Sequence, residues 1–203
     1  MIFAGCWFGD KKPTMATFLK PLYEELSFLL MDKGITVESS ERGKFLCRAV
    51  LLAGSCDLPA RCLVCNSLQF NGEYGCWKCF QQGRTEKIGI QGHTKIFPYI
   101  RDNPKGPLQN KQDTTKHSYE ALRNLQSGQK QYAVKGVKGP SWLLFLENFD
   151  VVVGMGIDYM HRVLLGVQKL LKLWFGDTYS KEPFSFRHLV GVLDDRLNEI
   201  LPT

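Results

Sequence analysis

Apolar and polar positions in the N-terminal third alternate in blocks that predict regular elements. Residues 2–9 form an apolar block that predicts a strand, followed by a turn. Between Met15 and Leu30, apolar side chains recur every three or four residues, which predicts an amphipathic helix. Gly34 follows at the position where glycine commonly ends a helix. We therefore expect a strand followed by a helix.

Two further strands and a new helix are predicted after this turn. Residues 35–39 alternate between apolar and polar, and residues 45–56 are almost continuously apolar, as in a buried strand. Asp57 and Pro59 then resemble the start of a helix. This order of elements is typical of an α/β fold.

The pattern changes at Gly83. As far as Lys116 the sequence is rich in Gly, Pro, Gln, Asn, Lys and Thr, and it predicts a largely irregular insertion. A short helix is expected over residues 118–125, and apolar sequence resumes at Trp142 after a Gly/Pro-rich break. We therefore divide the chain into residues 1–82, a basic insertion or linker at 83–140, and a helical part at 141–203.

The clearest helical pattern begins near Ile157. A second helix is expected over residues 185–201. Asp158 and His161 are three residues apart and share a face beside the apolar stripe of the first helix. That stripe consists of Met160, Val163, Leu164, Val167, Leu170, Leu171 and Trp174.

Composition narrows the class of protein. Hydrophobic residues make up 44% of the 203 residues, which is enough for a globular core, and no window is apolar for the length of a membrane span. Residues 1–9 are apolar but lack the basic start and cleavage site of a signal peptide. Seven cysteines, two pairs of them at metal-type spacing, favour a reducing, intracellular compartment over secretion.

The positive charge is concentrated in the middle of the chain. The segment from Gly83 to Pro140 has eleven Lys/Arg and four Asp/Glu, whereas the rest has fifteen and sixteen. A local excess of cations suits contact with a phosphate backbone, although from charge alone a solvated insertion is the slightly better interpretation. Candidate nucleic-acid-contacting side chains are Lys105, Lys111 and Lys116.

Two Cys-x2-Cys pairs, at Cys62/Cys65 and Cys76/Cys79, are spaced like zinc ligands. The second pair lies in a glycine- and aromatic-containing loop and is the better candidate for a zinc knuckle. Cys62 and Cys65 fall on the helix predicted after Asp57, where cysteines are also ordinary core residues. Their role stays open between metal ligand and core.

Asp57 is the most notable acid in the sequence because it follows a predicted buried strand. Carboxylates at such strand ends in α/β folds face the crevice where ligands bind. An Asp immediately before a helix is, however, also a good N-cap. Both interpretations stay open. Other acids and the isolated His93, His117 and His188 carry no functional hypothesis.

Several motifs, taken in order, resemble transposases of CACTA (En/Spm) type elements and genes derived from them. The likeness runs through most of the chain and is weakest in the basic segment. The matching residues are Trp7-Phe8-Gly9, Lys12-Pro13-Thr14-Met15, Phe18-Leu19-Lys20-Pro21-Leu22, Cys56-Asp57-Leu58-Pro59-Ala60-Arg61, Gln69-Phe70-Asn71-Gly72-Glu73-Tyr74-Gly75-Cys76 with Cys79, Gly136-x-Lys138-Gly139-Pro140-Ser141, and Ile157 to Gly166.

The resemblance implies a partial ribonuclease H-like core of the DDE class. In that family three acids hold two Mg²⁺ or Mn²⁺ ions for DNA strand cleavage and transfer. Asp57 matches the second acid. The resemblance also implies a structural Zn²⁺ held by Cys76, Cys79 and His161, with Asp158 as a candidate fourth ligand.

The first and third acids of the family have no good counterpart in this chain; Asp10, Glu182 and Glu199 are weak substitutes. We therefore expect an interior fragment or a decayed or domesticated copy that is catalytically incomplete. DNA is the expected partner, a homo-oligomer is compatible with the sequence, and the resemblance implies a nuclear location. The alternative is a zinc-stabilised nucleic-acid-binding or protein-interaction module without catalysis.

Overall fold

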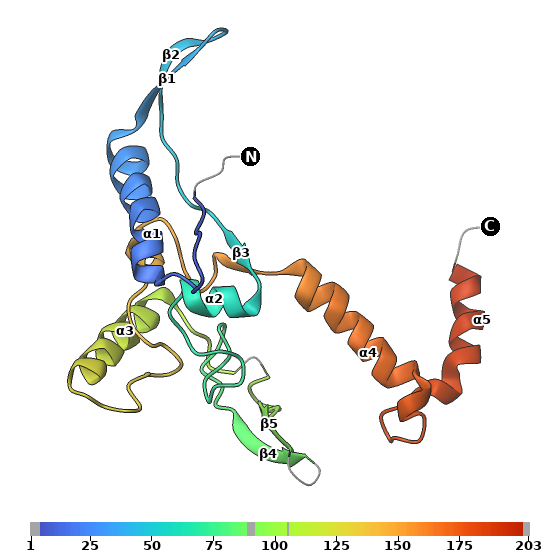
Figure 1. The fold of residues 1–203 in the computed structure, drawn as a ribbon. Coiled ribbons are helices and arrows are strands. Elements are labelled where there is room, and N and C mark those ends of the chain that lie inside the picture. Colours follow the sequence, from blue (N-terminus) through green and yellow to red (C-terminus); the bar gives the residue numbers. More distant parts are fainter. Residues whose placement is uncertain (1–4, 89–91, 105, 201–203) are drawn as a thin grey trace. The chain divides into compact units, whose positions relative to one another are not determined.

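The computed structural model describes residues 5–88, 92–104 and 106–200 (Figure 1). The chain divides into two units, residues 1–156 and residues 157–203. The three segments expected from composition stay a prediction.

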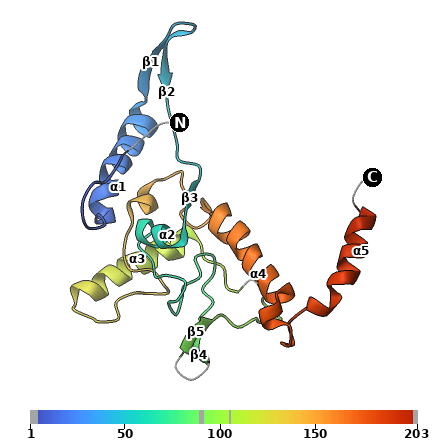
Figure 2. The ribbon, with the colours of Figure 1, turned by 45° about the vertical axis from the view of Figure 1, so that its right-hand side comes forward.

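The predicted first helix is confirmed. Helix α1 (Met15–Glu24) continues through a π-helical segment (Glu25–Lys33) and ends at Gly34, whose φ of +73° favours glycine. Strands β1 (Ile35–Ser39) and β2 (Gly43–Cys47) follow as an antiparallel hairpin (Figures 1 and 2). The strand predicted at residues 35–39 is thus correct.

The single buried strand expected over residues 45–56 is wrong. Strand β2 ends at Cys47, residues 48–53 have no regular structure, and β3 is only Gly54–Cys56. The run changes partner between its two halves, because β2 pairs with β1 whereas β3 pairs with β6 (Met155–Ile157). Gly54 lies so close to Met155 that a Cβ there would be 2.9 Å from its Sδ.

The strand expected at residues 2–9 is also absent from the described part of this segment. Residues 5–8 have no regular structure, and residues 2–4 lie outside the described part of the chain. The indole nitrogen Nε1 of Trp7 donates to the carbonyl of Lys11 at 2.8 Å, so the segment folds back on itself. Phe8 is fully exposed.

The core of the first unit is built around residues 142–155. A 3₁₀ turn (Trp142–Phe145) begins this segment, and helix α2 (Leu58–Val64) and the loop that follows it pack against it. Burial of such apolar surface is the main force that holds the unit together. The buried members of the cluster are Cys65, Trp77, Leu143, Leu144, Leu146, Phe149, Val151, Val152 and Met155.

The middle segment is more regular than expected. Strands β4 (Arg84–Ile88) and β5 (Gly92–Ile96) form an antiparallel hairpin, and α3 covers Lys111–Gln126, where a helix was expected only over 118–125. The α3 helix begins at the N-cap Asn110, whose side chain accepts a hydrogen bond from the amide of Asp113. Its buried positions are small: Thr114, Ser118 and Ala121.

The second unit consists of helices. A π-helical turn (Tyr159–Leu164) leads into α4 (Leu165–Phe175), and α5 covers Val190–Ile200 after a short 3₁₀ turn. The first predicted helix is therefore confirmed, and the second is confirmed from residue 187 to residue 200, while residue 201 lies outside the described part of the chain. Buried Ser185 helps to hold the connection, because its hydroxyl donates to the carbonyl of Trp174 at 3.2 Å.

The fold class is mixed α/β, as expected. Each sheet within the described residues has two strands, in the pairs β1–β2, β3–β6 and β4–β5. The ribonuclease H-like core implied by the resemblance therefore stays a prediction. Across the same residues, no helix has both the length and the apolar character needed to cross a bilayer.

Candidate functional site

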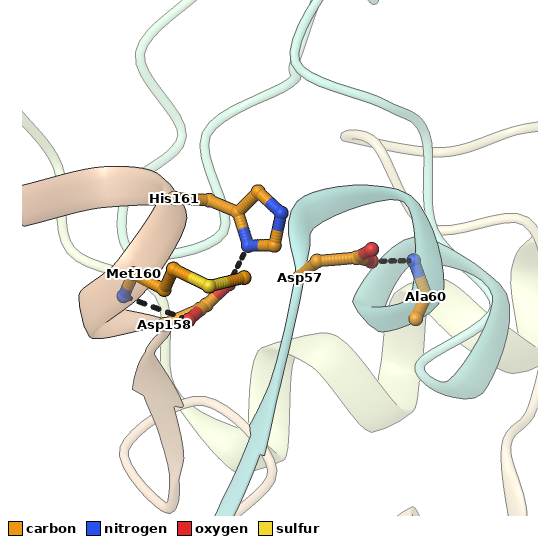
Figure 3. A network of polar contacts seen from close by, with 5 residues as sticks. All are labelled: Asp57, Ala60, Asp158, Met160 and His161. Atoms are coloured by element: carbon orange, nitrogen blue, oxygen red, sulfur yellow. Dashed lines mark hydrogen bonds and ion pairs between the residues drawn. The ribbon is translucent and has the colours of Figure 1, made fainter. Parts of the chain in front are cut away.

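Asp57 lies between the end of β3 and the start of α2, where the sequence placed it. Its Oδ1 accepts a hydrogen bond from the amide of Ala60 at 2.7 Å, so Asp57 is the N-cap of α2 (Figure 3). Pro59 occupies the first turn of this helix. The cap interpretation is confirmed, and a catalytic role for the same carboxyl group stays a prediction.

Cys62 and Cys65 are core residues of the first unit. Their exposed fractions are 5% and 1%, and the Cys62 thiol donates to the carbonyl of Leu68 at 3.2 Å. Burial raises the pKa of Cys65 to about 12. Since a cysteine must lose its proton to bind a metal, this environment disfavours Cys65 as a ligand.

Cys76 and Cys79 lie next to each other at one end of a tight loop. The pKa of Cys79 is raised, chiefly by burial and also by the neighbouring thiol of Cys76. Cys76 is half-buried and Cys79 is buried. The spacing of two residues therefore brings two sulfur donors to one point, as a zinc knuckle requires.

Gln109 fixes the backbone of this loop and was missed by sequence reasoning. Its Nε2 donates to the carbonyl of Cys76 at 2.9 Å and to that of Cys79 at 3.2 Å, while its own amide donates to the carbonyl of Lys78 at 3.0 Å. The side-chain oxygen Oε1 of Gln109 is buried without a hydrogen-bond partner. A contact over thirty residues has no local sequence signal.

Lys78, inside the same loop, joins it to the core. Its Nζ donates to the carbonyls of Val152 and Met155, the latter at 3.1 Å. Burial, followed by the nearby charge of Arg61, lowers the pKa of Lys78. The cysteine loop is thus attached to the folded core and is not a free surface turn.

Asp158 and His161 form a pair in the second unit, at the start of the π-helical turn. Asp158 Oδ1 accepts from the amide of Met160 at 3.0 Å, and Oδ2 contacts Nδ1 of His161 (Figure 3). The hydrogen bond with His161 is the first cause of a lowered pKa at Asp158. One carboxylate therefore caps the turn and orients the imidazole.

The three lysines proposed as DNA contacts have different environments. Lys105 lies outside the described residues. Lys111 is half-buried, and its Nζ donates to the carbonyls of Leu146 at 2.7 Å and Glu147 at 3.2 Å, so it has a structural role. Lys116 is exposed on α3 and is available to a ligand.

Sequence reasoning also missed a surface cleft of about 350 Å³ in the first unit. It is lined mainly by residues 130–136 and by Tyr74 and its neighbours. In residues 5–88, 92–104 and 106–200, no group of three or more His, Cys, Asp and Glu side chains gathers as metal ligands would. The four-residue zinc set draws on both units and stays a prediction.

Comparison of the chain with models of known protein families, with curated proteins and with solved structures found no match. The chemistry of its own residues therefore carries the functional conclusion.

Proposed function

We propose that this chain is a zinc-stabilised DNA-binding protein related to CACTA-type transposases. The observation that carries this proposal is the adjacent pair of thiols at Cys76 and Cys79, in a loop whose backbone is fixed by Gln109. A zinc ion replaces the thiol protons in such a loop and holds it in one conformation.

The donor chemistry of the cysteine loop fits Zn²⁺. Cys76 and Cys79 would supply two thiolates, and His161 is a further ligand implied by the resemblance alone. The contact of His161 Nδ1 with Asp158 leaves Nε2 as the ring nitrogen that would bind a metal. Zinc-bound histidines commonly have a carboxylate on the second ring nitrogen, so Asp158 suits the role of an orienting partner better than that of a fourth ligand.

DNA binding is supported by the cations of residues 83–140. Exposed lysines occur on α3 and in the loop after it, at Lys116, Lys130 and Lys135. Neutralising phosphates with such side chains releases condensed counterions, which makes the affinity depend strongly on salt. The same segment contributes Gln109, so DNA binding and the cysteine loop are structurally linked.

Strand cleavage is the second candidate function, favoured only by the position of Asp57 after β3. Mg²⁺ or Mn²⁺ would be the cofactor that this chemistry needs. Incubation of the full chain with linear duplex DNA and either metal tests it. Cleavage that Asp57→Asn abolishes would establish this function, because asparagine preserves the helix cap.

Metal analysis of the purified full chain tests the zinc proposal. We expect about one zinc per chain, lost in Cys76→Ser and in Cys79→Ser. The matched control is Cys6→Ser, because Cys6 is exposed and has no role in the loop. A metal-free protein whose stability does not respond to added zinc or to a chelator would contradict the proposal.

Fluorescence anisotropy measurements on labelled duplex DNA test the proposed DNA binding. The affinity should fall steeply as salt rises from about 50 to about 200 mM. Lys116→Gln should lower the slope of log affinity against log salt by about 0.9, and the exposed Lys44 serves as the control position. An affinity that is indifferent to salt would exclude binding through phosphates.

A further inference from the structure

The cleft beside Tyr74 has the chemistry of a nucleotide site. We propose that it binds an unpaired nucleotide of a DNA strand, with the base stacked on Tyr132 and the flanking phosphates held by Lys130 and Lys135. This inference rests on the proposed DNA-binding function and names the form of DNA that this site takes. The lining residues that matter are Leu68, Tyr74, Lys130, Tyr132, Lys135 and Gly136.

A tight turn forms one wall of the cleft. Val134 and Val137 exchange two backbone hydrogen bonds, each 2.9 Å long, around Lys135 and Gly136. The amide of Leu68 donates to the carbonyl of Gly136 at 2.8 Å, which fixes the turn against the opposite wall. A Cβ on Gly136 would lie 2.2 Å from the Tyr74 carbonyl oxygen, so only glycine permits this approach.

Lys135 occupies an unfavourable backbone conformation. Its φ is +46° and that of Gly136 is +85°, the pattern of a type I′ turn, in which Asn-Gly is the preferred pair. A lysine with positive φ is strained, and such strain is found mainly where a side chain has a function. Asparagine would suit the turn better but would provide no cation.

The ammonium group of Lys135 lies over the ring of Tyr74, so Tyr132 is the lining tyrosine left for a base. The Nζ of Lys135 is 3.0 Å from the Tyr74 hydroxyl oxygen and 4.5 Å from the centre of the ring. Lys130 and Lys135 are exposed, whereas Tyr74 and Tyr132 are half-buried. Cations along an aromatic platform are the usual combination in proteins that bind single-stranded nucleic acid.

The surrounding charges also favour a phosphate. The positive charges of Lys116 and Lys135 both lower the pKa of His117 on α3, so cations extend from the cleft onto that helix. Glu73 is the acidic residue in the lining, and its Oε1 accepts a hydrogen bond from Gln82 Nε2. The rim is therefore net positive.

Size and chemistry separate an unpaired base from other ligands. A cavity of about 350 Å³ lies at the small end of the range for ligand sites, which suits one nucleotide and excludes a duplex. An acidic peptide would use the lysines but would gain little from the tyrosines. The contribution of the Tyr132 ring to the affinity therefore distinguishes a nucleotide from an acidic peptide.

Fluorescence anisotropy with a labelled oligothymidine of about 12 nucleotides, and with a duplex of the same length, tests the proposal on the full chain. Tyr132→Ala should weaken single-strand binding by about 5- to 150-fold and leave duplex binding unchanged. Tyr132→Phe should bind like the wild type. Tyr99→Ala, at an exposed tyrosine outside the cleft, is the matched control.

Lys135 separates the effect on folding from the effect on binding. Lys135→Asn should raise the melting temperature, because it relieves the strained turn, and yet weaken single-strand binding. Lys135→Gln removes the charge but keeps the strain. Both substitutions should reduce the salt slope for the single strand by about 0.7, and the control Lys44→Gln should not.

The outcomes distinguish this inference from the function on which it rests. If the wild type binds neither DNA, the proposed function fails. If it binds DNA with the expected salt dependence but the Tyr132 and Lys135 variants behave like the wild type, only the cleft proposal is overturned. Equal losses for single strand and duplex in Tyr132→Ala, or displacement of the strand by polyglutamate with no effect of Tyr132→Ala, would also overturn it.

Discussion

The indole nitrogen of Trp77 donates a hydrogen bond to the carbonyl of Val151 at 3.0 Å, across 74 residues of sequence. Trp77 lies between Cys76 and Cys79, and both it and Val151 belong to the buried core cluster. The candidate zinc loop is therefore anchored in the core by its central side chain. Folding of the first unit and shaping of the loop depend on the same contact.

Replacing Trp77 should destabilise the first unit, and by more for Trp77→Ala than for Trp77→Phe. Trp77→Phe retains most of the apolar volume but leaves the buried Val151 carbonyl unpaired, at a cost of about 1–3 kcal/mol. Trp77→Ala also creates a cavity and should cost about 3–5 kcal/mol. Urea unfolding measures both, with the half-exposed Trp7→Phe as the control. Equal stabilities for Trp77→Phe and the wild type would show that the hydrogen bond contributes nothing.

Asp57 gives a second prediction, on the helix cap. Asp57→Ala should lower the free energy of unfolding by about 0.5–2 kcal/mol, because the amide of Ala60 loses its acceptor. Asp57→Asn should restore most of this loss, since asparagine caps a helix about as well as aspartate. A variant with asparagine that is as unstable as the alanine variant would show that the negative charge, and not the cap, is important.

The sequence predicted elements well where apolar residues repeat at regular spacing. Residues 15–33 and the helices of residues 157–203 have such stripes, and they are helical. The α3 helix was predicted eight residues too short, since its buried side chains are Thr114, Ser118 and Ala121 and leave no apolar stripe. The strand predicted from the apolar run 45–56 was too long, because the two halves of this run pair with different strands.

The candidate site was predictable only where it is local. Two residues of spacing were enough to bring Cys76 and Cys79 together, and the Asp before Pro59 was enough to predict a cap. The contacts of Gln109 with the cysteine loop and of Lys135 with Tyr74 join segments 30 or more residues apart. Such contacts depend on the tertiary fold, and no short motif encodes them.

Cys65 leads to a prediction at alkaline pH. Burial raises its folded-state pKa from 9.0 to about 12, so its contribution to stability is complete below pH 9 and is lost as the pH rises toward 12. Between pH 8.5 and 10 the wild type should lose about 1 kcal/mol more than Cys65→Ala.

Urea unfolding at the two pH values measures this difference in free energy. Alkylation at pH 8 followed by mass spectrometry provides an independent check: exposed Cys6 should react in the native protein, whereas Cys65 should react only after unfolding. Rapid modification of native Cys65 would contradict its burial in the core.

His117 gives the last prediction, on its protonation at mildly acidic pH. Its Nδ1 is buried without a partner, and its ring packs edge-on to Phe80 with centroids 5.2 Å apart. Burial is the first cause of a lowered pKa; the charges of Lys116 and Lys135 lower it further, while Asp113 and Glu120 oppose them. The neutral ring is therefore the form that the fold favours.

A histidine with a lowered folded-state pKa stabilises the protein above the unfolded value of about 6.5, and that contribution is lost as the pH falls through the folded value. The melting temperature of the wild type should therefore fall between pH 7.5 and 5.5 by more than that of His117→Gln, whereas the exposed His93→Gln should behave like the wild type.

An NMR titration of the His117 imidazole measures whether the charge of Lys135, in the cleft, affects the pKa of this histidine. Because the ammonium of Lys135 lowers the pKa of His117, Lys135→Asn should raise it, and Asp113→Asn should lower it. An unchanged pKa in Lys135→Asn would mean that Lys135 is not close enough to affect His117, and the extension of the cations from the cleft onto α3 would then lose its support.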